Sequence, residues 1–184
     1  MRIILSLNIL IFLLLGTNLK NEKAEPNLII DLNEGIGQIK IGKVTKSDVE
    51  KILGKGKVKK YTISFCSKGT GTFKKVVYKK LGIEMFYDYD YPKKLKKNDT
   101  LVGIEFLSFC KLKTEDGIGI GSTRADIEQI YGEPNHEKFV ILMNGKTVYH
   151  SIDYDKTRFE FEKTFIDSKN KKNAKVKSIL IGVY

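Results

Sequence analysis

The stretch DGIGIGSTRAD (116–126) places glycines at alternate positions directly before a predicted helix, at Gly117, Gly119 and Gly121. Glycine-rich loops at a helix N-terminus can bind phosphate, because the backbone approaches the ligand closely and the first helical amides are unpaired. The dinucleotide fingerprint requires Gly-x-Gly-x-x-Gly between a buried parallel strand and a helix. Here Ser122 stands in place of the third glycine, and the preceding KLKTED does not read as a buried strand. The pattern therefore argues against a nucleotide site, and we expect no cofactor.

Two Asp-Tyr-Asp motifs, Asp88–Asp90 and Asp153–Asp155, are candidates for binding a hard cation. Alternate residues of a strand face one side of the sheet, so each motif can offer two carboxylates to calcium. Aspartate is also common at strand ends and in loops, where both motifs are predicted to lie. No metal site is therefore assigned, and no carboxylate spacing selects a glycosidase-like pair.

The N-terminus is typical of a secretory signal peptide. Arg2 precedes an apolar run from Ile3 to Leu15, and a polar stretch follows. This run of 13 residues is too short to span a bilayer comfortably. Cleavage near Ala24 would remove residues 1–24 and export the remainder to the periplasm or the medium. No small-x-small cleavage site stands out, so an uncleaved signal anchor remains the alternative.

Cys66 and Cys110 are the only cysteines, and His136 and His150 are the only histidines. No Cys-x-x-Cys, Gly-x-Ser-x-Gly, His-Glu-x-x-His or zinc-type cluster is present, and neither histidine stands in a motif-like relation to a cysteine. We therefore expect no catalytic residues and no enzyme activity. An even number of cysteines in an exported chain favours a disulfide between Cys66 and Cys110.

The chain is strongly basic. Its net charge is +11, and it falls to +9 without residues 1–24, which contain three basic residues and one acidic residue. A charge of this size attracts nucleic acid, anionic lipid or an acidic partner. Only three of the 33 basic residues are arginines, however, and arginine is preferred for bidentate recognition of phosphate. Dispersed lysine argues against nucleic acid, and leaves binding to an acidic polymer or an anionic membrane surface as an alternative function.

The candidate residues named above must be positioned by the helices and strands of the fold. Two segments of the chain resemble each other at a constant offset of 78 residues: TKSDVEKILGKG (45–56) and TRADIEQIYGEP (123–134). In each, a threonine is the predicted helix N-cap and an aspartate three residues later completes a capping box. Apolar residues recur at i, i+3 and i+4, which predicts one apolar stripe per helix. A glycine then ends each helix.

After each predicted helix, apolar residues alternate with the period of two that is typical of strands. The predicted strands are 60–66, 73–80, 83–89 and 101–109, followed by 138–143, 146–154, 158–165 and 176–184. MNGK at 143–146 is a two-residue hairpin signal. The predicted fold class is therefore α+β, with two tandem helix-plus-four-strand repeats (25–112 and 113–184) that form an antiparallel sheet with the helices packed on one face.

The stretch IGSTRADIEQIYGEP resembles the motif that opens the compact α+β unit of the exported BamE family (SmpA/OmlA type). The second copy carries the motif at Gly121, Ser122, Thr123, Asp126, Ile127, Tyr131, Gly132 and Pro134. The first copy carries it at Gly42, Thr45, Asp48, Val49, Leu53 and Gly54. A tandem pair of such units is also similar to the β-lactamase-inhibitor protein fold, in which one long sheet presents a concave face to a partner. The resemblance transfers no binding residue, and the lipid-bearing cysteine of the BamE family is missing because no cysteine precedes Cys66.

The strand GIEMFYDYDY places Met85, Tyr87 and Tyr89 on one face and Phe86 and Asp88 on the other. Tyrosine is enriched at interfaces, so the set with two tyrosines is the candidate partner-binding face. The alternative is that these tyrosines only decorate an antiparallel sheet. The sequence thus predicts an exported, non-enzymatic protein–protein interaction module of the bacterial envelope, which binds an unknown protein through its sheet face.

Overall fold

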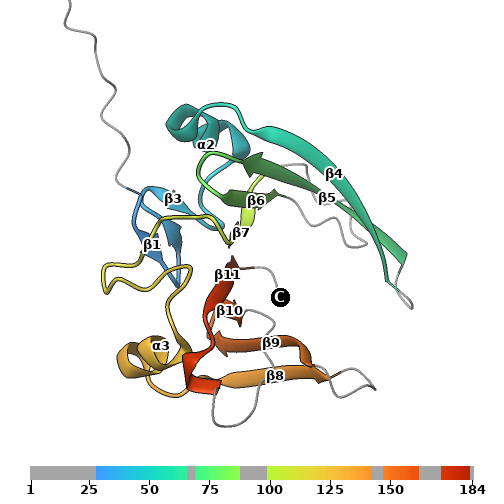
Figure 1. Ribbon diagram of the computed structural model, residues 1–184. Coiled ribbons are helices and arrows are strands. Elements are labelled where there is room, and N and C mark those ends of the chain that lie inside the picture. Colours follow the sequence, from blue (N-terminus) through green and yellow to red (C-terminus); the bar gives the residue numbers. More distant parts are fainter. Residues whose placement is uncertain (1–27, 66–68, 88–98, 142–146, 162–170, 183–184) are drawn as a thin grey trace, which may run out of the picture.

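The computed structural model describes residues 28–65, 69–87, 99–141, 147–161 and 171–182 (Figure 1). These residues form eleven strands, two α-helices and one short 3₁₀-helix. The first elements are β1 (Ile30–Asp31), β2 (Gly35–Ile36), β3 (Ile39–Lys40), α2 (Lys46–Leu53), β4 (Lys57–Phe65), β5 (Gly69–Tyr78), β6 (Ile83–Tyr87) and β7 (Leu101–Phe106). They are followed by α3 (Arg124–Tyr131), β8 (His136–Ile141), β9 (Thr147–Tyr154), β10 (Thr157–Phe161), η1 (Lys171–Asn173) and β11 (Val176–Gly182).

Strands β4 to β11 form one antiparallel sheet in the order β4-β5-β6-β7-β11-β10-β9-β8. The two central strands are β7 and β11, with Ile104 opposite Ile181. Because successive side chains of a strand point to opposite faces, the registers give the sheet one common apolar face. This face carries the buried residues Val76, Met85, Ile104, Ile179, Phe159 and Ile152.

The two helices begin with the same hydrogen bonds, as the sequence predicts. The Thr45 side chain accepts a hydrogen bond from the Asp48 amide, and the Asp48 carboxylate accepts one from the Thr45 amide. Thr123 and Asp126 form the same capping box at the start of α3. Each box supplies partners for amides that have none inside the helix. Both helices also end at a glycine with positive φ, at Gly54 and Gly132.

A second sheet, formed by β1, β2 and β3, packs on the centre of the first. It buries three isoleucines, Ile30, Ile36 and Ile39. A Cβ on Gly35 would lie 3.4 Å from Cδ1 of Ile104, so the small sheet contacts the apolar face of β7. The hydroxyl of Thr157 also donates to the carbonyl of Leu32. In Figure 1 the small sheet lies between α2 and α3, and its buried side chains join those of both halves of the chain in one core.

The predicted α+β class, with two helix-plus-four-strand repeats, is wrong. The described residues are mostly antiparallel strand in two sheets, and their only α-helices are two of eight residues each. The difference lies in the segment before the first helix. We predict no strand in that segment, because strands of two residues are too short to show alternation, yet it forms β1 to β3. The segment before α3 forms no such sheet among the described residues and makes only isolated bridges, Ile30–Thr114, Lys113–Gly119 and Thr123–Lys175, so the two halves are not copies of one unit.

No helix in the described part of the chain is long and apolar enough to cross a membrane. The predicted signal peptide, residues 1–24, lies outside the described residues. Export of the protein therefore stays a prediction.

Candidate functional site

The glycines before α3 form turns and internal hydrogen bonds instead of a phosphate cradle. The Gly117 amide donates to a carbonyl of the preceding turn at 3.0 Å, and the Gly121 amide donates to the carbonyl of Val176 at 2.8 Å. The Gly119 amide donates to Oγ of Ser122 at 3.1 Å. These donors are already occupied, so the stretch attaches α3 to β11.

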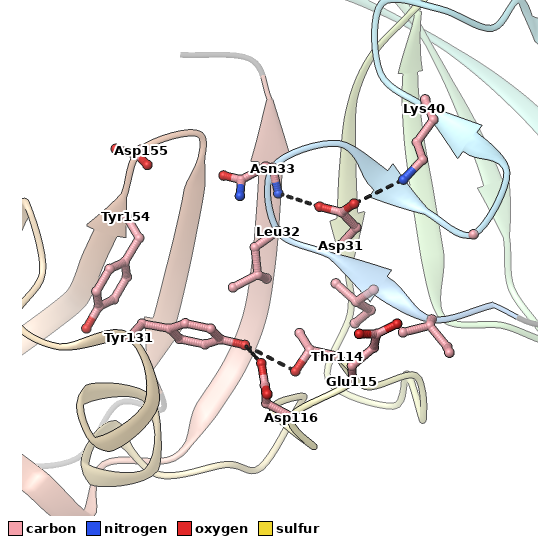
Figure 2. A pocket seen from close by; sticks show the side chains of 13 residues that line it. Asp31, Leu32, Asn33, Lys40, Thr114, Glu115, Asp116, Tyr131, Tyr154 and Asp155 are labelled. Atoms are coloured by element: carbon pink, nitrogen blue, oxygen red, sulfur yellow. Dashed lines mark hydrogen bonds and ion pairs between the residues drawn. The ribbon is translucent and has the colours of Figure 1, made fainter.

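The turn at residues 114–116 also forms one wall of a pocket of about 600 Å³ (Figure 2). The other walls come from β1 with the turn after it, and from the ends of α3 and β9. These segments meet because the small sheet packs beside the second half of the large one, where the Ile30 amide donates to the carbonyl of Lys113 at 2.9 Å. The polar and aromatic side chains that line the pocket include Asp31, Asn33, Thr114, Glu115, Asp116, Tyr131, Tyr154 and Asp155.

Two tyrosines form the aromatic wall of the pocket. The ring centroids of Tyr131 and Tyr154 lie 6.1 Å apart, with an angle of 63° between the ring planes. The Tyr131 hydroxyl lies 3.2 Å from Oγ1 of Thr114 and 3.3 Å from Oδ2 of Asp116, within hydrogen-bond distance of both oxygens. The Tyr154 hydroxyl donates to the carbonyl of Gly132 at 2.7 Å. Because both hydroxyls are held by the protein, the wall is formed before any ligand binds.

Four carboxylates surround the pocket, and Figure 2 shows them on both sides of the tyrosines. Asp31 pairs with Lys40 at 3.0 Å, and Asp116 accepts a hydrogen bond from a tyrosine hydroxyl. Glu115 and Asp155 are exposed, and the described residues provide no ion-pair partner for either carboxylate. One lysine thus faces four carboxylates in a chain whose total charge is +11. Since salt screens charges beyond about 8–10 Å, the nearest groups dominate and the pocket attracts cations.

The protonation of these groups favours recognition over catalysis. Burial raises the pKa of Tyr154 to about 12, and burial also raises the pKa of Tyr131, so both hydroxyls are protonated donors at neutral pH. Burial acts to raise the pKa of Asp31, but hydrogen bonds from Lys40 and the Asn33 amide outweigh it and hold that pKa below its usual value. None of these three groups is suited to act as a general base near neutral pH.

The described residues also offer no metal centre. No three histidine, cysteine, aspartate or glutamate side chains among them are arranged to hold a metal ion. Of the two Asp-Tyr-Asp motifs, Asp88–Asp90 lies outside the described residues. In the other, Arg158 donates two hydrogen bonds to the Asp153 carboxylate, at 2.8 and 3.0 Å, while Asp155 lines the pocket. The two aspartates therefore have different surroundings and do not converge on one cation.

The predicted partner-binding face is wrong for the two residues that the structure describes. Met85 and Tyr87 lie on the core face of β6 and are fully buried, with the Tyr87 hydroxyl 3.5 Å from Sδ of Met85. Tyr89 lies outside the described residues. The period of two correctly places Met85 and Tyr87 on one face, but this pattern alone does not identify which face packs against the core.

The opposite face of the sheet carries charged side chains that pair with one another. Lys75 of β5 pairs with Glu84 of β6, and Arg158 of β10 pairs with Asp153 of β9. A partner that bound to this face would compete with these pairs. The pocket, in contrast, offers carboxylates that need not first be released from a lysine or arginine.

The predicted disulfide joins a described cysteine to one outside the described residues. Cys110 is buried, and burial raises the pKa of its thiol, which disfavours the reactive thiolate. Cys66 lies outside the described residues, so its pairing with Cys110 stays a prediction. Titration of thiols in the unreduced protein, before and after reduction, tests it.

A second polar cluster joins α3, β8, β9 and η1. Glu137 accepts a hydrogen bond from Arg124, lies 2.9 Å from Nε2 of His150, and binds Nζ of Lys171 at 2.6 Å. The His150 ring is stacked between two phenylalanine rings, with centroid distances of 4.4 Å to Phe139 and 4.6 Å to Phe161. These contacts leave only Nδ1 of His150 without a hydrogen-bond partner among the described residues of the cluster, and we assign the cluster a structural role.

Acidification is expected to destabilise this cluster through His150. Burial lowers the pKa of His150 below its usual value of 6.5, Arg124 and Lys171 act in the same direction, and Glu137 opposes them. The folded state prefers neutral imidazole, so this stabilisation is complete above pH 6.5 and is lost as the pH falls through the lower folded-state pKa. The free energy of unfolding, measured with urea, should fall more between pH 7.5 and pH 5.0 for the wild type than for His150→Phe. Equal losses in the two proteins would contradict this role.

Sequence reasoning did not find the pocket. Tyr131 is predicted only as an apolar position of the second helix, and Asp155 only as part of a cation motif. Asp31 belongs to the segment before the first helix, in which we predict no strand. No local signal joins these residues, because 124 positions separate Asp31 from Asp155.

No protein-family model matches this chain, and neither does any curated protein or any solved structure. The resemblance to the BamE family and to the β-lactamase-inhibitor protein fold therefore stays a prediction. The function of this chain must be inferred from its own residues.

Proposed function

We propose that this protein is an exported, non-enzymatic binding module that holds a basic side chain of a partner protein in the tyrosine- and carboxylate-lined pocket. The observation that carries the proposal is the presence of Glu115 and Asp155, two carboxylates that form no ion pair with the described residues, at a pocket with two ordered tyrosines. Ammonium and guanidinium groups form charge-assisted hydrogen bonds with carboxylates and bind to aromatic faces. Both kinds of contact are available to one lysine or arginine side chain here.

A peptide segment suits this pocket better than a free ion. The pocket is about 600 Å³ in volume and its walls are largely aromatic and polar, so it has room for the alkyl part of a basic side chain and for flanking peptide groups. The amide side chain of Asn33 lies at the same pocket, where it can bond to a peptide backbone (Figure 2). The signal-like N-terminus supports a partner outside the cytoplasm.

The proposal predicts selective binding of basic probes. Acetyl-arginine amide and acetyl-lysine amide, added to the purified protein, should shift the amide NMR signals of Tyr131, Tyr154 and Asp155. Acetyl-glutamine amide, which is similar in size and neutral, should not. Asp155→Asn should weaken arginine-amide binding about five- to ten-fold, because it removes one unpaired charge while asparagine tolerates the φ of 42° at this position.

Glu133→Gln is the matched control, since it removes one exposed charge near the end of α3 but does not line the pocket. It should weaken binding much less than Asp155→Asn, because its charge acts on Tyr154 from outside the pocket. Raising the salt concentration should weaken arginine-amide binding by the wild type, so that its affinity approaches that of Asp155→Asn. Equal shifts with the glutamine probe, or equal affinities in Asp155→Asn and Glu133→Gln, would defeat the proposal.

A further inference from the structure

A separate groove of about 860 Å³ lies at the end of α2, beside the turn between β5 and β6. It shares no lining residue with the carboxylate pocket, so its function can be tested independently. Its floor is apolar and comes from distant parts of the chain: Leu28, Ile52, Leu53, Tyr78, Leu81 and Leu112. Its rim carries four exposed lysines: Lys55, Lys57, Lys79 and Lys80.

The rim lysines differ from the two lysines of the neighbouring helix α2 in forming no ion pair with the described residues. Within the described part of the chain none of the four forms an ion pair or a side-chain hydrogen bond. On the neighbouring helix α2, in contrast, Lys46 binds Glu50 at 2.7 Å and Lys51 binds Asp48 at 3.0 Å. Glu50 is the carboxylate that acts on Tyr78 at the groove floor, and it is already paired with Lys46. The positive charge around the groove is therefore not neutralised by the described residues.

The floor of the groove is partly accessible near the end of β5. The link between α2 and β4 passes directly over the end of β5, where a Cβ on Gly56 would lie 2.4 Å from Cγ1 of Val76 and 3.1 Å from the Tyr78 ring. Leu53, Leu81 and Leu112 beside it are only partly buried. Aliphatic side chains that stay partly exposed in a groove offer a surface to an apolar ligand.

We propose that this groove binds a long-chain carboxylate, with the aliphatic chain on the leucine and isoleucine floor and the carboxylate head among the four lysines. An apolar floor with a cationic rim is complementary to an amphiphile that has one chain and one negative charge. The concave shape suits a single chain rather than a bilayer surface. The absence of arginine among the lining residues favours a carboxylate head over bidentate recognition of phosphate.

The test is calorimetric titration of the purified protein with dodecanoate below its micelle concentration. Octanoate should bind at least ten-fold more weakly, because each buried methylene contributes about 0.8 kcal/mol, or about four-fold in affinity. Dodecyltrimethylammonium, with the same chain and the opposite charge, should bind at least ten-fold more weakly than dodecanoate.

The double variant Lys57→Gln, Lys79→Gln should also lose at least ten-fold in dodecanoate affinity. Lys172→Gln, Lys175→Gln is the matched control, since it removes two exposed lysines that do not line the groove, and it should bind like the wild type. All four positions are exposed, so both variants are expected to fold. The proposal is overturned if dodecanoate does not bind, if the ammonium surfactant binds equally well, or if the two variants have equal affinity.

Discussion

Gly35→Ala is expected to lower the free energy of unfolding by about 3 kcal/mol or more. Gly35 has a φ of 139°, a conformation that other residues rarely adopt, and a Cβ there would lie 2.2 Å from the carbonyl oxygen of Ile39. The backbone of the three-stranded sheet fixes both the Cβ position at residue 35 and the carbonyl oxygen of Ile39, so no side-chain rotation relieves the contact. The substitution should therefore open β2 and β3 and loosen the small sheet from the core.

Gly42→Ala is the control for this prediction. Gly42 also has positive φ, at 76°, but a Cβ there would have no neighbour within 4 Å. Its cost should be about 1–2 kcal/mol, from the backbone conformation alone. Urea unfolding gives the free energy of unfolding of both variants. Equal losses of this free energy in Gly35→Ala and Gly42→Ala would show that the close approach of Gly35 to β3 does not affect stability. Gly35→Ala should also weaken arginine-amide binding, because the small sheet carries Asp31 into the pocket.

Tyr87→Ala is expected to cost about 3–5 kcal/mol of stability, as for other large aromatic residues removed from a core. Tyr87 is fully buried on β6, and β6 lies between β5 and β7 in the large sheet. Removal of its ring leaves a cavity next to Met85 that the surrounding strands cannot close completely. The loss should appear in thermal or urea unfolding without any partner present.

Phe109→Ala provides the comparison, because it also removes an aromatic ring but from a side chain that is 54% exposed. It should cost about 0.5 kcal/mol. This pair of variants distinguishes a core tyrosine from a partner-binding tyrosine. Wild-type stability in Tyr87→Ala would reverse our assignment and return Tyr87 to the candidate binding face.

The sequence by itself determined the two helices and the strands of the large sheet. All eight predicted strands of the large sheet are present among the described residues, and the predicted ends that fall there are shifted by up to four residues. Both capping boxes form as predicted, since their hydrogen bonds join residues only three positions apart. Alternation also correctly placed Met85 and Tyr87 on a common face. These features depend on neighbours in the chain, so a single sequence is enough to predict them.

Tertiary structure alone decided which face of the sheet is buried, and with it where the protein can bind a partner. The small sheet packs on the apolar face of the large sheet at Ile104 of β7, and its strands of two residues are formed by pairing and packing rather than by local pattern. The same packing brings Asp31 to Tyr131 and Asp155 and so creates the candidate pocket. Such contacts between distant residues depend on how whole elements pack, because the burial of a side chain depends on every element that packs around it in the core.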